Sequence, residues 1–557
     1  MRGFQWRLLG AVFLASVGLG ARATLPAPPD LILTGDFITL DPATPRAETI
    51  AITGQRIVAV GPKAMVLALA GPRTERVAIP GVALPGFADA HAHPSALGEQ
   101  LEILDLAGLS KGEIIARVAA ASRTAPGGEW LRGTGWDQGR WQPPEFPTAA
   151  ELDAASGTHP ALLDRVDGHS VWVNSRALGL AHIARDTPDP KGGRILRDAA
   201  GEPAGILVDA AVGLMSRVVP EPTHATRERR LRAALAQYAA WGLTGVHDAG
   251  DSLADIGLYK ELLAKKALPI RVYAMALGTG DAAEHYLSSG PEIGLGEGRL
   301  TVRSFKVLLD GALGSRGAQL SEPYSDAPSE RGLELMSDPA LATLVSRAAA
   351  KDFQVCVHAI GDRANHRLLD IFSTAGDAAR RLRFRDEHAS IVRDEDVPRF
   401  AALGVIASMQ PVFVGEYSRW AAERVGPARL HWVYRTRDLL EHGAVVASGT
   451  DFPSSDAGDA VATLYSMVTR SGPDGTPAEG WLPDQKVGVD VALRSMTAGP
   501  AFASFQENDL GALTVGRYAD ITVLSADPYA VAPRDLRSLR VLMTWVGGKV
   551  VFDAGRR

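Results

Sequence analysis

The sequence contains a single cysteine, Cys356, among its 557 residues. One cysteine excludes both an intramolecular disulfide and a cysteine-rich zinc cluster. Any metal that this chain binds must therefore be held by histidine, aspartate, glutamate or lysine side chains.

Long apolar runs and basic stretches are also scarce. The N-terminal apolar run covers residues 8–20 and is shorter than the roughly 20 residues that span a bilayer. The formal net charge is −6, and acidic and basic residues are interspersed, so no basic stripe is available to neutralise phosphates. We therefore expect no nucleic-acid partner and no stable membrane insertion of the mature chain. The expected partner is a small-molecule substrate, with a homodimer as one option for the assembly.

Residues 1–23 have the composition of a secretory signal peptide. Two arginines accompany the apolar run, and Ala-Arg-Ala at 21–23 has the small-x-small form of a signal-peptidase site. We predict cleavage after this site and export to a bacterial periplasm, with secretion as an alternative. An uncleaved membrane anchor is the other interpretation of this segment.

Both ends of the mature chain have the composition of β-structure. The stretches LILTGDFITL and AITGQRIVAVG near the start, and ADITVL and VLMTWVGGKVVF near the end, are rich in β-branched residues and interrupted by glycine. We predict that residues 30–86 and 505–557 form one small composite β-sandwich.

Between these ends, short apolar runs alternate with helix-like segments, which favours βα units and a parallel sheet. Eight candidate strands lie in or end at FADAHAH, VHDAG, LPIRVYAMAL, LTVRSFKVLL, FQVCVHAIGD, RFRDEHASI, GVIASMQP and GAVVASGTDFP. Polar residues at nearly every strand end favour a (β/α)8 TIM-type barrel over residues 87–504 rather than a doubly wound sheet. The stretch from about 100 to 240 is too long for one crossover, so we predict an inserted subdomain after the first barrel strand.

Histidine and aspartate side chains follow several of these strands. His91 and His93 lie two residues apart, so in an extended chain they point to the same side. Alone, the pair is equally well explained as polar residues lining a cleft. However, His358, His388 and Asp451 each end a different apolar run, and the C-terminal ends of barrel strands meet on one face. Together the five side chains predict a metal site.

Lys306 lies inside an apolar strand, where lysine is seldom found unless it is paired or used chemically. Burial and nearby cations would lower its pKa, and a neutral amine can be carboxylated by carbon dioxide to give an anionic bridging ligand. The alternatives are a pair with Asp310 or a side chain that points outward. Asp310 and Arg316 follow in a glycine-rich loop that is suited to shaping a substrate site.

These residues belong to a series of motifs that resembles the amidohydrolase superfamily, and most closely its N-substituted formamide deformylase-like branch, often called amidohydrolase family 3. The resemblance extends over nearly the whole mature chain. The motifs are LPGFADAHAHP, GTGWD at 133–137, DGHSVWVNSRAL at 167–178, KVLLDGALGSRGA from 306, VHAIGD, EHAS, SMQP, SGTDFP and GALTVGRYADITVL.

The resemblance implies a barrel flanked by a β-sandwich from both termini, with one or two divalent metals. Around the first metal it implies His91, His93, a carboxylated Lys306 and Asp451, and around the second Lys306, His358 and His388. Substrate-facing positions are implied for His169, Trp136, Asp137, His247 and Gln410.

Two positions near the predicted ligands are notable for their residue type. Thr450 precedes Asp451 where the family usually has serine, a change that keeps a hydroxyl group. Cys356 lies two residues before His358 on the same predicted strand, and we expect a core thiol below the site rather than a ligand.

The predicted function is hydrolysis of a C–N bond in an amide, N-formyl or cyclic amide substrate. Metal-activated hydroxide would attack, and Asp451 would carry the proton to the leaving amine. The alternatives are ester or carbamate hydrolysis or deamination with one metal and an unmodified Lys306, and an exported binding protein without turnover. Mixed ligands suit zinc first, and manganese, iron and cobalt stay open. An apolar substrate pocket is only mildly indicated, by Trp136, Trp172, Phe413 and Trp432.

Overall fold

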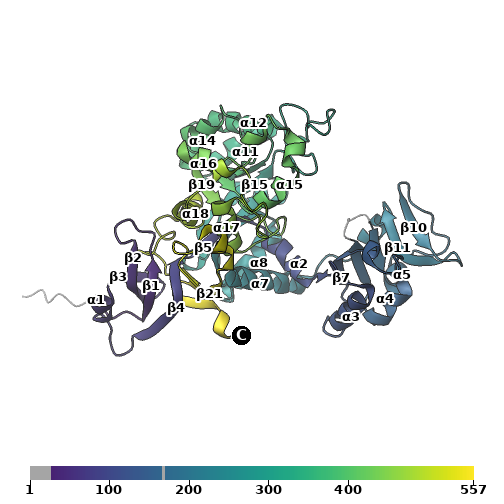
Figure 1. Cartoon of the computed structure of the whole chain (residues 1–557), viewed down its shortest axis with the longest axis horizontal. Helices are drawn as coiled ribbons and strands as arrows, with labels where there is room; N and C mark the ends of the chain where they lie inside the picture. Colours follow the sequence, from purple (N-terminus) through teal and green to yellow (C-terminus); the bar gives the residue numbers. More distant parts are fainter. Residues whose placement is uncertain (1–26, 166–169, 557) are drawn as a thin grey trace, which may run out of the picture.

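The computed structural model describes residues 27–165 and 170–556, and three β-sheets organise this part of the chain (Figure 1). The predicted signal segment and the predicted substrate contact His169 lie outside the described residues. Among the helices of the described ranges, none combines the length and the apolar character needed to cross a bilayer.

Eight parallel strands form the central barrel. Their order in the sheet follows their order in the chain: β5 (Phe87–Ala92), β12 (Leu243–Asp251), β13 (Arg271–Leu277), β15 (Leu300–Leu308), β16 (Gln354–Ala359), β17 (Arg385–His388), β18 (Ile406–Met409) and β19 (Val445–Ser448). A short strand, β14 (Glu292–Gly294), pairs antiparallel with β15 outside this path. The eight strands coincide with the eight apolar runs in the sequence, so the predicted barrel is confirmed.

The first and last barrel strands approach each other closely at their C-terminal ends. The amides of Thr450 and Asp451 donate to the carbonyl oxygen of His91, at 3.2 and 2.6 Å. A side chain at Gly449 would collide with the backbone nitrogen of His91, so only glycine permits this approach. The Asp89 carboxylate accepts from the amides of His91 and Thr450, both at 3.0 Å, and from the Thr450 hydroxyl at 2.6 Å. The hydroxyl that the sequence keeps at 450 therefore helps to close the barrel.

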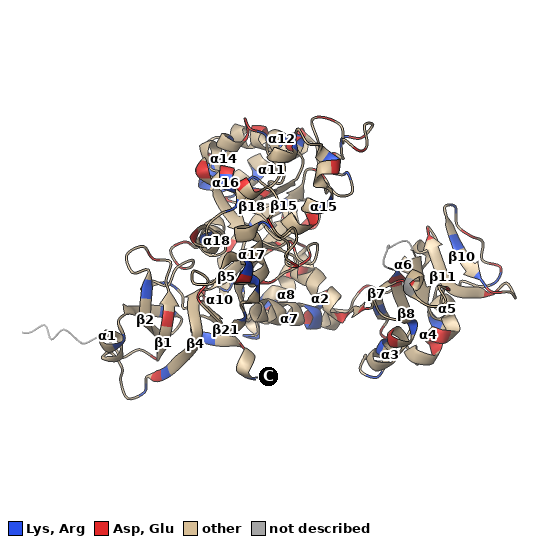
Figure 2. Ribbon diagram, viewed as in Figure 1, with Lys and Arg blue, Asp and Glu red and all other residues tan. Residues whose placement is uncertain are grey.

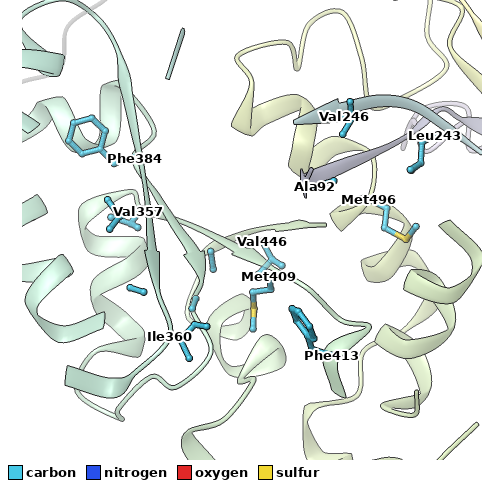
Figure 3. Packing of buried hydrophobic residues seen from close by; sticks show 14 of the residues in the cluster. Ala92, Leu243, Val246, Val357, Ile360, Phe384, Met409, Phe413, Val446 and Met496 are labelled. Atoms are coloured by element: carbon cyan, nitrogen blue, oxygen red, sulfur yellow. The ribbon is translucent and has the colours of Figure 1, made fainter. Parts of the chain in front are cut away.

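Helices cover the outside of the barrel, as βα repeats require. They are α2 (Pro94–Glu102), α7 (His224–Ala240), α8 (Leu253–Ala264), α9 (Gly280–Ser289), α10 (Leu295–Gly298), α11 (Asp338–Ala349), α12 (Asp362–Thr374), α13 (Asp377–Arg381), α14 (Val397–Leu403), α15 (Phe413–Val425), α16 (Thr436–Glu441), α17 (Ala460–Thr469), α18 (Val489–Ser495) and α19 (Ala498–Ala503). Outward-facing strand residues such as Val246, Val357 and Val446 belong to the apolar core between strands and helices (Figure 3). This packed shell fixes the strand ends that carry the polar residues.

The insertion between β5 and β12 has its own sheet. Its strands are ordered β10 (Gly193–Arg197), β11 (Pro203–Asp209), β9 (Ser170–Val173), β8 (Ala161–Arg165), β7 (Leu131–Trp136) and β6 (Leu104–Asp105), with helices α3 (Lys111–Ser122), α4 (Ala149–Ser156), α5 (Ser175–Leu180) and α6 (Gly213–Ser216). It projects from the side of the barrel beyond α2 and α7 (Figure 1). Residues of the insertion, α2 and α7 line a cleft of about 1350 Å³, and none of the six predicted metal ligands lines it.

The two chain ends form one continuous seven-stranded sheet. Its order is β22 (Lys549–Asp553), β21 (Val541–Val546), β20 (Ile521–Leu524), β4 (Glu75–Pro85), β1 (Leu31–Ile38), β2 (Arg46–Thr53) and β3 (Arg56–Gly61), and α1 (Lys63–Leu67) packs beside it. Strands from both ends contribute to one apolar cluster, which includes Phe37, Ile50 and Trp545. The N-terminal and C-terminal segments therefore need each other to bury their apolar faces.

Charged residues of both signs are interspersed along the ribbon of all three units (Figure 2). One ion pair is buried where the terminal sheet meets the barrel. Arg271 on β13 binds both carboxylate oxygens of Asp520, at 2.7 and 2.9 Å. The same carboxylate accepts from the amide of Gly547 at 2.8 Å, and the guanidinium lies 3.8 Å from the ring centroid of Tyr518. This pair joins the barrel to the segment that completes the terminal sheet.

We predict that Asp520→Ala destabilises the protein by about 3–5 kcal/mol, because it leaves the buried Arg271 charge without a partner. The measurement is the free energy of unfolding in guanidinium chloride. The matched control is Asp509→Ala, which removes an exposed partner of Arg56 and should cost at most about 1 kcal/mol. Equal unfolding midpoints for the two variants would contradict the assignment of Asp520 as a link between the units.

Candidate metal centre

Four histidine rings meet at the C-terminal mouth of the barrel. His91 lies on β5 and His93 directly after it, while His358 and His388 lie on β16 and β17. The ring centroids are 5.5 Å apart for His91 and His93, 4.8 Å for His91 and His388, and 4.4 Å for His358 and His388. The predicted convergence of imidazoles from separate strands is therefore present in the structure.

The Asp451 carboxylate joins this group from the loop after β19. Its Oδ1 atom lies 2.9 Å from Nε2 of His93 and 3.5 Å from Nε2 of His91. One potential ligand atom from each of these three residues falls within 4.8 Å of the others. They form a compact candidate site for a divalent cation.

Lys306 faces the same group from β15. Lys306 is only 4% exposed. Desolvation lowers the pKa of its amine, and the negative charges of Glu387 and Asp451 oppose that shift. Its positive charge acts in turn on His91, His358 and His388. All six side chains named from the sequence as ligands thus lie in one neighbourhood.

Burial favours the neutral form of three of the imidazoles, and two of these rings have a free nitrogen, as a metal requires. Burial lowers the pKa of His358 to about 3 and those of His91 and His388 well below the ordinary value, and the Lys306 charge lowers them further. The Nε2 atoms of His91 and His358 are buried without a hydrogen-bond partner among the described residues. Neutral rings with unpartnered nitrogens at one point fit a cation, because a buried polar atom is costly unless something binds it.

Two residues that sequence reasoning missed orient His91. Oε2 of Glu387 lies 2.5 Å from Nδ1 of His91, and Nε and Nη2 of Arg385 lie 2.7 and 3.1 Å from the Glu387 oxygens. Arg385 and Glu387 are fully buried. A ring N–H that donates to a carboxylate leaves the other ring nitrogen free for an ion. Four consecutive polar residues, RDEH, in a strand expected to be buried were the signal that could have revealed this pair.

Gln410 and His247 also contact this polar network. Oε1 of Gln410 accepts at 2.9 Å from Nδ1 of His388, and its amide nitrogen donates to the Ser408 carbonyl. His247 lies deeper, with Nδ1 3.0 Å from the Arg385 guanidinium and its ring against Tyr273. In this structure the contacts of Gln410 and His247 orient other side chains.

Two of the predicted ligands have unusual backbone conformations. His388 has φ of 85° and Asp451 has φ of 60°, both in the left-handed region that residues with a side chain seldom adopt. Such strain persists only where the surroundings hold the residue in place, and it concentrates at functional sites. The closing hydrogen bond from the amide of Asp451 to His91 is part of that restraint.

The other predicted substrate residues of the loop after β15 are engaged in local contacts. The Asp310 carboxylate accepts from the amides of Gln319, Ile360 and Gly361, at 2.8, 3.0 and 2.8 Å. Arg316 pairs with Asp326 at 2.8 Å on the surface. Asp310 therefore ties the loop to the end of β16, next to His358.

Trp136 and Asp137 make their contacts inside the insertion. The Trp136 indole donates to the carbonyl of Leu163 and packs against Trp172 in the apolar core of that unit. Asp137 pairs with Arg165 at 2.9 Å. The indication of an apolar pocket that Trp136 and Trp172 gave from the sequence is thus accounted for by the insertion's own core.

Cys356 occupies the interior of the barrel below the histidines. Its fully buried thiol clusters with Ala249, Tyr273 and Met275, and Sγ lies 3.3 Å from Oε1 of Gln354. Burial raises the pKa of this thiol, which disfavours the thiolate form that binds metals.

The chain is similar in sequence and in fold to several known proteins. The chain is 29% identical over 553 residues to the N-substituted formamide deformylase of Arthrobacter pascens, covering 94% of this chain and 98% of that one. It is 33% identical over 551 residues to the protein LONG AFTER FAR-RED 3 of Arabidopsis thaliana, with 94% and 91% covered. Among solved structures, an uncharacterized metal-dependent hydrolase from Pyrococcus furiosus superposes with a TM-score of 0.74 at 27% identity, covering 90% of this chain and 99% of that one.

The family model that matches this sequence extends across the barrel, the insertion and the C-terminal strands of the terminal sheet. It covers residues 81–552, which include every predicted ligand. The chain therefore belongs to the amidohydrolase family.

Proposed function

We propose that this protein is a metal-dependent hydrolase that cleaves the C–N bond of an amide, N-formyl or cyclic amide substrate. The observation that carries the proposal is the convergence of four imidazoles and the Asp451 carboxylate, with two buried ring nitrogens left unpartnered. Similarity to the N-substituted formamide deformylase over nearly the full length of both chains supports an N-formyl or related small amide as substrate.

The donor set divides into two groups around Lys306. His91, His93 and Asp451 would hold one cation, and His358 and His388 a second if Lys306 is carboxylated. Carboxylation joins the Lys306 nitrogen to the carbon of carbon dioxide with loss of one proton, whereas an unmodified Lys306 suits a single ion. When bound, a divalent cation supplies Lewis-acid polarisation and lowers the pKa of water toward about 7, and zinc suits these ligands best.

Asp451 is the carboxylate that can move protons during the reaction. Hydrolysis must remove a proton from water and deliver one to the leaving nitrogen. Glu387 is occupied by Arg385 and His91, and Asp310 is held by three backbone amides. The Asp451 side chain is 11% exposed at the mouth, so it reaches both the site and the incoming substrate.

The decisive experiment is a substrate screen with protein that has been stripped of metal and reloaded with zinc or manganese. N-formyl amines, N-acyl amino acids, cyclic amides and small esters are supplied, and the released amine and acid are quantified. We expect C–N cleavage that stops with a chelator and returns with metal. Ester cleavage alone would favour the esterase alternative, and absence of any turnover would favour a binding protein.

Asp451→Asn preserves the shape of the side chain but removes its ability to accept a proton. We predict a fall in kcat of about 10²–10⁴-fold, measured together with metal content so that loss of the ion is recognised. Asp456→Asn, a nearby exposed aspartate, serves as the control and should leave kcat unchanged. Unaltered turnover in Asp451→Asn would remove this residue from the mechanism.

Glu387→Gln tests the orientation of His91. The amide can still accept from Arg385 but no longer offers the carboxylate that fixes the ring N–H of His91. We predict a metal affinity about 10–100-fold weaker, measured by competition with a chromophoric chelator. Glu395→Gln on the surface is the control, and affinities that match for both variants would show that Glu387 does not orient the ligand.

A further inference from the structure

The mouth of the barrel has two chemically different sides. The ends of β5, β16, β17 and β19 contribute the imidazoles and the Asp451 carboxylate. The ends of β13 and β15 contribute Leu277 and Leu308, which are 37% and 43% exposed although most of both strands is buried. Two exposed leucines on adjacent strands at the mouth of a barrel differ from scattered surface leucines, which need no explanation.

Strand alternation directs both leucines toward the mouth. On β15, Phe305 and Val307 pack outward in the main core, so Lys306 and Leu308 share the opposite side. On β13, Tyr273 and Met275 face the barrel interior with Cys356, and Leu277 shares their side.

Each leucine is a direct neighbour of a predicted metal ligand. Leu308 pairs in register with His358 across β15 and β16, and Leu277 pairs with Lys306 across β13 and β15. Register partners on adjacent strands lie about 4.8 Å apart. An apolar group that contacts these leucines would therefore lie beside the reacting bond.

Glycine widens the space on this side. Gly250 is the last residue but one of β12 and has φ of 125°, and a Cβ atom there would lie 3.5 Å from Cδ2 of Leu277 and 3.8 Å from Cγ of Lys306. The absence of a side chain leaves room next to both residues. Three neighbouring strand ends thus present Gly250, Leu277 and Leu308, and Lys306 lies beside them.

We infer that Leu277, Leu308 and the gap at Gly250 form a subsite for a bulky apolar group next to the scissile bond. This inference rests on the proposed function, since it concerns the same site. The substrate class is an amide that carries a branched alkyl or aromatic substituent, rather than one with a charged substituent. Apolar walls with a few convergent polar groups are the usual composition of a small-molecule site.

The kinetic test compares N-isobutylformamide with N-methylformamide and with an N-formyl compound that carries a carboxylate. Wild-type kcat/KM should be about 10–200-fold higher for the isobutyl compound than for the methyl compound. Leu277→Ala and Leu308→Ala should remove most of this ratio while changing the methyl substrate less than about threefold, and Leu308→Met should retain it. The control Leu69→Ala truncates an exposed leucine after α1 in the terminal unit and should change neither substrate.

A binding measurement separates this inference from the proposed function. Calorimetry on chelator-stripped protein should show isobutylformamide binding about tenfold or more tighter than methylformamide, with the difference lost in both alanine variants. That result would support the apolar subsite even if no formamide is hydrolysed. Equal affinities in the wild type, a preference for the charged compound, or an equal effect of the variants on all substrates would overturn it while leaving C–N hydrolysis intact.

Discussion

Closure of the barrel between β5 and β19 is the constraint on which the rest of the structure depends. Without the bonds from the amides of Thr450 and Asp451 to His91, the carboxylate from the last strand would not reach the imidazoles from the first. The approach requires Gly449 and is secured by the buried Asp89 carboxylate, whose pKa burial raises to about 7. Two residues that bind no substrate thus determine where the candidate ligands meet.

Burial of charge is the second constraint, and it applies above all to β17, whose charged residues are buried. Arg385 and Glu387 are fully buried, and a buried ion pair often contributes little net stability relative to apolar residues of the same size. The gain here is orientation, because Arg385 holds Glu387 and Glu387 holds the ring of His91. Removal of either residue would leave an unpaired charge inside the barrel, so the two form one structural element of the metal centre.

The sequence predicted the eight barrel strands because their apolar runs and polar ends follow from the packing of any (β/α)8 barrel. It also identified the residues that converge, since strand ends meet on one face whatever the loops do. It could not identify Glu387 as the partner of His91, because their contact crosses the barrel between strands 296 positions apart in the chain. The motifs also could not show that Trp136 lies in the core of the insertion and not at the barrel mouth. A residue can belong to a family motif without lying at the site, because a motif does not state where in the fold its residues lie.

The strands that carry the predicted histidine ligands and the strands that carry the proposed apolar subsite lie on different sides of the barrel mouth. The imidazoles and the Asp451 carboxylate come from β5, β16, β17 and β19, which form one arc of the barrel mouth. The neighbouring arc of β12, β13 and β15 contributes glycine and leucine, and Lys306 on β15 lies between the two arcs. Because the arcs belong to different βα units, a substitution at Leu277 or Leu308 alters the wall without disturbing the bonds that close β5 on β19. Substrate preference can therefore change while the metal centre stays constant, and Lys306 is the position where a change would affect both.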